Sequence, residues 1–214
     1  MAADVLAHAE ELALGFCLTE GLAPESAALP ADLAANTVEV VAAPFDRERV
    51  QRSFYTSSSC GVCGKGALEE VAVHSAPLPD GPVIPRALLA DLPERLRQPT
   101  FERTGGLHAT GLFTPDGELV CAREDVGRHN AMDKVIGWAL REGLVPRHPR
   151  VLCVSGRLSF ELVQKAAVAG APVLVGVGAP TSLAVRLAED RGLTLCGFAR
   201  GGRVNAYTKT VRVG

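Results

Sequence analysis

The chain has 214 residues, of which 47% are apolar and 21% charged, and its formal net charge is −2. A net charge this close to zero argues against the basic surface of a nucleic-acid-binding protein and against a polybasic patch that binds a membrane. With only 5% aromatic residues, the chain also has few side chains on which bases could stack. No apolar run reaches the roughly 18 residues that span a bilayer, and no signal-peptide pattern is present. We therefore expect a cytoplasmic protein without nucleic-acid or membrane partners.

The N-terminal part of the chain predicts one helix and one or two strands. Asp4 can cap a first helix with apolar residues at helical spacing. Residues 37–43 form an expected strand, and residues 50–56 a second one that leads into a cysteine-containing loop. Residues 76–99 hold six prolines around a short helical stretch near 85–92, which indicates a connection between two parts of the protein.

The C-terminal part has a regular pattern. A hairpin is expected from 106–113 and 118–122, because Thr-Pro-Asp-Gly supplies the turn between them. Strands and helices then alternate, which predicts an α/β fold with a parallel sheet, and the apolar runs VLCVS and VLVGV are typical of strands covered on both faces. The expected helices are 128–141, 159–169 and 181–190, and the expected strands are 150–155, 172–177 and 194–198.

Residues 57–66 read SSSCGVCGKG and contain Cys60 and Cys63, whereas the other four cysteines lie in apolar runs and should pack like small hydrophobic residues. Exposure and the nearby Lys65 would keep a thiolate available. Four interpretations of this loop are open. A zinc site would need two distant further ligands, and a redox pair would sit at the start of a helix. A sulfur carrier needs a flexible, exposed thiolate, and the loop could also be inert.

His8-Ala9-Glu10 followed by Cys60-x-x-Cys63 has the order of residues found in zinc deaminases, which use H-x-E and P-C-x-x-C. Ser59 stands in place of the proline, the gap is long, and few residues precede His8. We therefore expect His8 and Glu10 to lie on the exposed side of the first helix.

Several predicted strand ends carry residues suited to an anion. Arg128 and His129 begin a helix, Ser155 and Arg157 follow one strand, and the turn 178–182 follows the next. Helix N-termini bind anions, and ligands of α/β sheets bind beyond the carboxyl ends of the strands. Ordinary helix caps and solvated loops are the alternative. A glycine-rich segment after the last strand also suits a phosphate or pyrophosphate. It comprises Phe198, Ala199, Arg200, Gly201, Gly202 and Arg203.

Longer stretches resemble the FdhD family of formate dehydrogenase accessory sulfurtransferases, in the family's order over nearly the whole chain. They are SSSCGVCGK, TGGLHATGLF, REDVGRHNAMDKVIG, SGRLSFELVQK, GAPTSLAVRLAEDRGLTLCGFARGG and NAYT. The resemblance implies a cytidine-deaminase-like three-layer α/β/α core without the deaminase zinc chemistry, and a smaller N-terminal α+β part. We place that part at 1–75, the proline-rich connection at 76–99 and the core at 100–214.

The resemblance also implies a sulfur relay in a homodimer. A cysteine desulfurase would donate sulfur to Cys60 as a persulfide, with Cys63 as a supporting thiol. The sulfur would then pass to the bis-molybdopterin guanine dinucleotide cofactor, bound as a substrate, before its insertion into formate dehydrogenase. No metal would be bound directly by the protein. The family's cofactor-binding segment corresponds to 198–203, and we add Arg128, His129, Ser155 and Arg157 from the strand-end argument.

The chain departs from the family pattern in two places. The segment before residue 11 is short, so the N-terminal sheet is expected to be incomplete, and Gly178 stands where the family usually has serine. Two other functions stay open. One is a cofactor chaperone in which the thiols matter little, and the other is a zinc-dependent hydrolase or deaminase.

Overall fold

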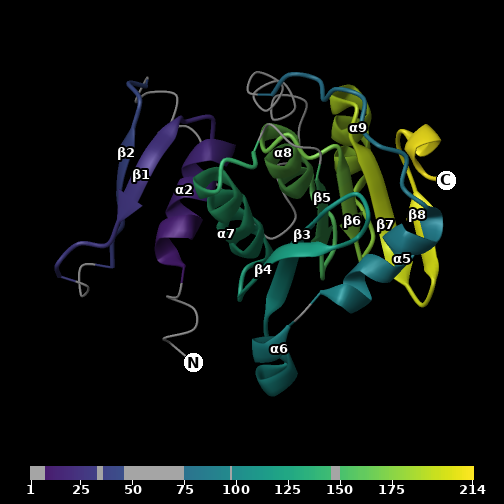
Figure 1. Cartoon of the computed structure of the whole chain (residues 1–214), viewed down its shortest axis with the longest axis horizontal. Helices are drawn as coiled ribbons and strands as arrows, with labels where there is room; N and C mark the ends of the chain where they lie inside the picture. Colours follow the sequence, from purple (N-terminus) through teal and green to yellow (C-terminus); the bar gives the residue numbers. More distant parts are fainter. Residues whose placement is uncertain (1–7, 33–35, 46–74, 97, 146–149) are drawn as a thin grey trace.

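The computed structural model describes residues 8–32, 36–45, 75–96, 98–145 and 150–214. At its centre is a six-stranded mixed sheet with helices on both faces, so the predicted α/β class is confirmed (Figure 1). The strands lie in the order β4-β3-β5-β6-β7-β8. Their bounds are β3 (His108–Phe113), β4 (Leu119–Asp125), β5 (Val151–Val154), β6 (Val173–Gly176), β7 (Thr194–Arg200) and β8 (Arg203–Ala206).

The helices and a second, small sheet surround this centre. An antiparallel pair of strands lies beyond the first helix, at the left of Figure 1. None of the helices in the described ranges is long and apolar enough to cross a membrane. The bounds are α2 (Ala9–Thr19), β1 (Pro24–Ala28), β2 (Glu39–Ala42), α5 (Arg86–Arg95), α6 (Pro99–Thr104), α7 (Arg128–Arg141), α8 (Phe160–Val168), α9 (Ser182–Arg191) and the 3-10 turn η3 (Thr210–Arg212).

The sheet is parallel only at its centre. Strands β5, β6 and β7 run parallel, as predicted, but β3 pairs antiparallel with both β4 and β5, and β8 pairs antiparallel with β7. The hairpin expected from 106–113 and 118–122 is confirmed as β3 and β4, and the sheet is mixed because this hairpin and strand β8 add antiparallel strands on the two sides of the parallel centre. The antiparallel direction of β3 brings its first residue, His108, to the carboxyl end of β5.

The central strands bury both faces, which explains their unbroken apolar runs. In β5, Leu152 and Val154 belong to one core shared with α7, α8 and α9, whereas Val151 and Cys153 belong to the opposite core beneath α5. Helix α5 confirms the helix expected near 85–92, and its leucines enter that second core. The division of the chain into two parts and a connection stays a prediction.

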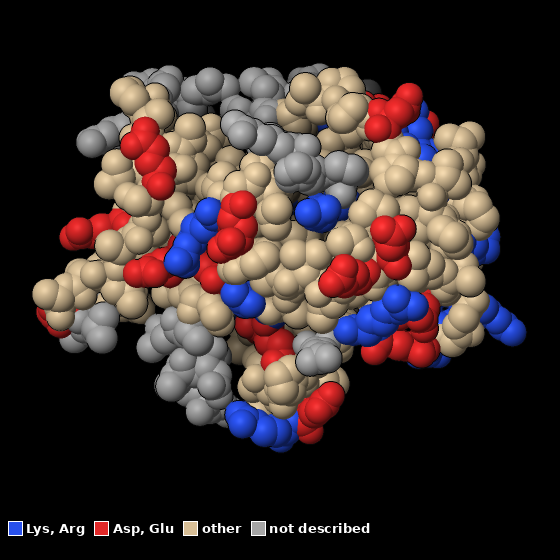
Figure 2. Space-filling model, viewed as in Figure 1, with Lys and Arg blue, Asp and Glu red and all other residues tan. Residues whose placement is uncertain are grey.

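Four described elements were missed by the sequence analysis, namely β1, α6, β8 and the 3-10 turn η3. Strand β1 has the sequence PESAA, with no β-branched residue, and forms through its antiparallel pairing with β2. Helix α6 is a short segment, and β8 returns along β7 after two glycines. The expected strand at 50–56 lies outside the described residues. On the face shown in Figure 2, acidic and basic side chains are interspersed, in keeping with the small net charge.

Helices α2 and α7 touch through their backbones (Figure 1). A Cβ atom placed on Gly15 would lie 1.8 Å from the carbonyl oxygen of Asp133, and one on Gly137 would lie 1.9 Å from that of Glu11. Real Cβ atoms do not approach an oxygen so closely, so only glycine fits at either position. This contact fixes α2 against the outer side of α7.

We expect Gly137→Ala to lower the free energy of unfolding by about 3 kcal/mol or more, because the new methyl group collides with the backbone of α2. In an exposed helix the same change would raise stability by about 1 kcal/mol, so the sign of the effect is diagnostic. Urea denaturation measures it. The control is Gly106→Ala, whose Cβ would have no neighbour closer than 3.9 Å. Equal stability of the two variants would contradict the close contact.

Candidate functional site

The predicted thiol pair, Cys60 and Cys63, lies outside the described residues. The other cysteines are core-like, as expected from their apolar surroundings, although one of them is only half-buried. Burial raises the pKa of all four thiols, that of Cys121 to about 11 and that of Cys196 to about 12, so these thiols are protonated and poorly nucleophilic at neutral pH. The four are Cys17, Cys121, Cys153 and Cys196.

The turns that follow β5 and β6 lie beside each other and beside the last part of β7. The backbone N–H of Gly178 donates to the carbonyl oxygen of Gly156 at 3.0 Å, and the N–H of Phe198 donates to the carbonyl oxygen of Gly178 at 3.2 Å. These bonds link the turns after β5 and β6 to the last part of β7. The predicted strand-end residues are therefore brought together at one edge of the sheet, where α/β proteins bind ligands.

Ser155 has a structural contact at this edge. Its hydroxyl oxygen accepts a hydrogen bond from the N–H of Ala109 at 2.9 Å, and its own N–H donates to the carbonyl oxygen of Ala109 at 3.0 Å. These bonds hold the beginning of β3 against the end of β5. The imidazole of His108 consequently lies over Gly156, where a Cβ atom would be 3.3 Å from its Nδ1 and 3.9 Å from the Cδ of Arg128.

His108, Arg128 and Arg157, which we call the cationic cluster, come from three different elements. Arg157 is exposed, and Gly178 permits its close approach, because a Cβ there would lie 2.9 Å from the Cα of Arg157. The pKa of His108 is lowered, first by burial and then by the two guanidinium groups. The sequence analysis missed His108, because its position depends on the pairing of β3 with β5, which no local pattern signals.

His129 lies beside Arg128 but contacts the beginning of α8. Its Nε2 is 3.2 Å from the hydroxyl of Ser159 and 3.8 Å from a carboxylate oxygen of Glu161. Burial first, and then the charge of Arg128, lowers the pKa of His129 to about 4, although Glu161 opposes the shift. The imidazole is therefore neutral at pH 7, so of the predicted pair only Arg128 brings positive charge there.

The segment 198–203 forms most of the hairpin that joins β7 to β8. Arg200 pairs with Arg203 across the turn, and Gly201 and Gly202 have φ angles of 58° and 72°. Positive φ at both central residues is the type I′ geometry, which glycine adopts without strain. Both arginine side chains are exposed at this tip.

Phe198 is held in an unusual conformation in the same hairpin. Its φ angle is 54°, in the left-handed region that bulky residues avoid, and the residue is 49% exposed. The neighbouring Ala199 is fully buried, and the pairing of β7 with β8 is irregular between Gly197 and Arg200. Strain of this kind in a β-strand next to a ligand edge marks a functional candidate.

The polar sequence from 123 to 134 positions Arg128. Asp125 accepts hydrogen bonds at one carboxylate oxygen from the N–H of Gly127, at 2.9 Å, and from the amide of Asn130, at 3.2 Å. Its other oxygen lies 2.7 Å from the Nζ of buried Lys134. Much of this motif therefore fixes the turn between β4 and α7, and it leaves Arg128 as the first residue of the helix.

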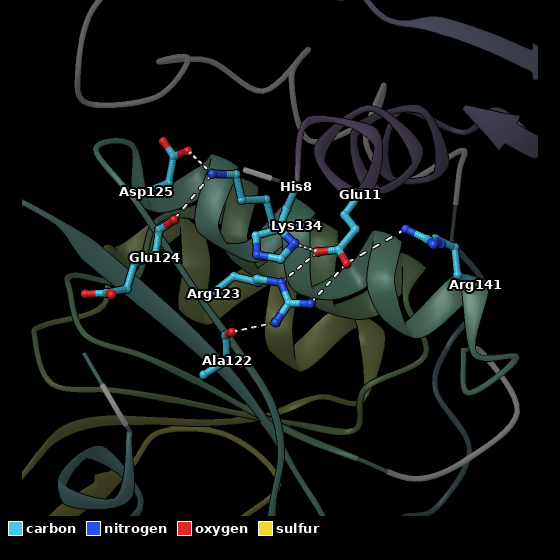
Figure 3. A network of polar contacts seen from close by, with 8 residues as sticks. All are labelled: His8, Glu11, Ala122, Arg123, Glu124, Asp125, Lys134 and Arg141. Atoms are coloured by element: carbon cyan, nitrogen blue, oxygen red, sulfur yellow. Dashed lines mark hydrogen bonds and ion pairs between the residues drawn. The ribbon is translucent and has the colours of Figure 1, made fainter. Parts of the chain in front are cut away.

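A second polar network ties α2 to β4 (Figure 3). The carboxylate of Glu11 is buried and accepts two hydrogen bonds from the guanidinium of Arg123, at 2.7 and 3.0 Å. His8 is exposed, as expected, and its Nδ1 lies 3.1 Å from the same carboxylate. Glu10 is half-buried rather than fully exposed. The imidazole of His8, the first residue of the H-x-E sequence, thus contacts the carboxylate of Glu11. The sequence analysis did not single out this buried acid.

These features define an α/β protein with a cationic cluster and an arginine-bearing hairpin at the carboxyl edge of its parallel strands. The model of the FdhD/NarQ family matches residues 3–214, and the chain belongs to that family.

The chain is similar to proteins called sulfur carrier protein FdhD. It is 59% identical to that of Nocardia farcinica over 166 residues, which cover 76% of this chain but only 60% of the relative. It is 50% identical to that of Streptomyces coelicolor over 222 residues, covering 94% of this chain and 78% of the relative. A crystal structure of a formate dehydrogenase accessory protein from Desulfotalea psychrophila is 26% identical, with a TM-score of 0.71 and coverage of 97% and 80%.

We expect stability to fall as the pH decreases from 6.5 to about 4, in part because of His129. The unfolded chain takes up a proton near the ordinary pKa of 6.5, whereas folded His129 does so only near 4, so protonation favours unfolding in this window. NMR titration of the imidazole signals and urea denaturation across the window measure both effects, with His129→Gln as the comparison. A His129 signal that titrates near 6.5 would contradict the burial of this side chain.

Proposed function

We propose that this protein is a sulfur carrier, which takes sulfur from a cysteine desulfurase onto Cys60 and passes it to bis-molybdopterin guanine dinucleotide destined for formate dehydrogenase. The observation that carries the proposal is the state of the described thiols. All four have raised pKa values and are therefore poor nucleophiles at neutral pH. We therefore assign the sulfur chemistry to the two cysteines of the CGVC sequence at 60–63. The names of the relatives support the same role.

The loading step is a transfer between two thiols. The thiolate of Cys60 attacks the terminal sulfur of a persulfide on the desulfurase. A new S–S bond forms at Cys60, the S–S bond of the donor breaks, and the donor cysteine leaves as a thiolate with the electron pair. No external oxidant or reductant is consumed. The cation of Lys65, five residues from Cys60 in sequence, favours the attacking thiolate.

Cys63 provides a route for release. Its thiolate attacks the Sγ of the Cys60 persulfide, the terminal sulfur leaves as hydrosulfide, and a disulfide joins the two cysteines. The terminal sulfur is thereby reduced and the two cysteine sulfurs are oxidised, and a dithiol reductant restores the pair for another cycle. This assigns different tasks to the two cysteines, with Cys60 as carrier and Cys63 as resolving thiol.

The cofactor is bound as a substrate at the hairpin edge of the sheet. Arg200 and Arg203 are exposed there and suit the phosphates of a guanine dinucleotide, because guanidinium groups bind phosphate in a bidentate manner. The exposed, strained ring of Phe198 offers a stacking surface to the guanine base. We further propose that the protein acts as a homodimer in the cytoplasm.

Incubation with a cysteine desulfurase and cysteine should add one labile sulfur atom to Cys60, because its thiolate is the acceptor. Mass spectrometry of intact protein and of peptides detects the addition. Cys60→Ser should abolish loading, whereas Cys63→Ser should load normally and release hydrosulfide more slowly.

Cys17→Ser is the matched control, since Cys17 is the one described cysteine that is not fully buried. Loading that persists in Cys60→Ser but disappears in Cys17→Ser would overturn the assignment of the carrier.

A chaperone that binds the cofactor without thiol chemistry is the second candidate, because the binding edge is built from described residues that include no cysteine. The two candidates differ in cells. In a strain that lacks its own carrier, the double variant Cys60→Ala, Cys63→Ala should fail to restore formate dehydrogenase activity if sulfur transfer is the function. Restoration to the wild-type level would favour the chaperone.

A further inference from the structure

The cationic cluster has more positive charge than the described part of the protein balances. In the described ranges, ion pairs with carboxylates are formed by other arginines, such as Arg95 and Arg123, but not by Arg128 or Arg157. The Nε of Arg128 is buried and has no hydrogen-bond partner. A buried guanidinium nitrogen without an acceptor is costly, and an anionic ligand would supply the acceptor.

The glycines at this edge make room for the cluster. The side chains of His108 and Arg128 lie over Gly156, and the backbone of Arg157 lies against Gly178, which is hydrogen-bonded to Gly156. A side chain at Gly178 would collide with Arg157 at 2.9 Å. Gly156 and Gly178, which are hydrogen-bonded to each other, thus let the imidazole of His108 and the guanidinium groups of Arg128 and Arg157 lie around one small region.

The region continues into the proposed nucleotide-binding hairpin. The N–H of Phe198 donates to the carbonyl oxygen of Gly178, and the backbone of Arg157 lies against the same glycine. Phe198 and Arg157 are therefore both neighbours of Gly178. A base stacked on Phe198 would therefore hold its phosphates within reach of the cluster. The pKa of His108, lowered first by burial and then by the two guanidinium groups, is consistent with this, because these groups already act on the imidazole.

We propose that His108, Arg128 and Arg157 form a subsite for the diphosphate group of a nucleotide, distinct from the arginines of the hairpin tip. The inference rests on the proposed function, since it assigns one of the two diphosphate groups of the bis-molybdopterin guanine dinucleotide substrate to this cluster and leaves the other to Arg200 and Arg203. Each guanidinium donates to phosphate oxygens, and the imidazole donates one further hydrogen bond. His108 thereby acquires a binding role that no sequence pattern gave it.

Isothermal titration calorimetry with GDP and with inorganic pyrophosphate tests the subsite. Arg157→Gln and His108→Gln should each weaken binding of both probes about tenfold or more, the loss expected for one charge-assisted hydrogen bond. Arg157 is exposed, so its replacement leaves the core unchanged. Arg186→Gln, which removes an exposed arginine from α9, is the control and should bind both probes like the wild type.

The outcomes separate this inference from the proposed function. GDP binding that is unchanged in Arg157→Gln and His108→Gln would overturn the subsite while leaving nucleotide binding at the hairpin intact. Pyrophosphate binding that depends on the cluster, without any binding of GDP, would support the subsite and contradict the guanine nucleotide as substrate. Failure of the wild-type protein to bind either probe would overturn both.

Discussion

The rest of the structure depends on the backbone contact between α2 and α7. Gly15 and Gly137 bring the two helices so close that neither position tolerates a methyl group. Acidic groups are buried on both sides of this contact, where Glu11 is neutralised by Arg123 and Asp133 by Lys165. Breaking one such pair leaves a buried charge, so the pairs fix α2, α7, α8 and β4 relative to one another. Through α7 they also fix the place of Arg128.

The residues of the candidate site are positioned by contacts with this framework rather than by contacts within the site's own loops. Asp125 and Lys134 hold the turn before α7, and Ser155 joins the end of β5 to the beginning of β3. Two glycines then allow the turns of the parallel strands to touch. The outcome is a cationic edge on rigid elements, next to a hairpin in which a strained phenylalanine is exposed. Pre-organised cations of this kind bind a polyphosphate with little loss of conformational entropy.

The two halves of the proposed function belong to different parts of the chain. The thiol chemistry depends on a short sequence rich in glycine and serine, whereas substrate binding depends on residues that four separate strands and helices bring together. A persulfide is reactive towards other thiols, and burial keeps Cys121, Cys153 and Cys196 away from such side reactions. In the proposed function, the same burial that stabilises the core therefore also keeps sulfur transfer at the CGVC pair.

The sequence by itself determined the α/β class, the bounds of α7 and the hairpin of β3 and β4, because apolar periodicity and turn residues are local properties. It also determined the family, through motifs that resemble those of FdhD proteins. It also indicated the core-like cysteines and the strand-end arginines. The tertiary structure alone decided that β3 pairs antiparallel with β5, that β1 and β8 form, and that Glu11 is buried. It likewise brought His108 to Arg128 and Arg157. These features depend on pairing between residues far apart in the chain, and strand pairing has no signature in either partner alone.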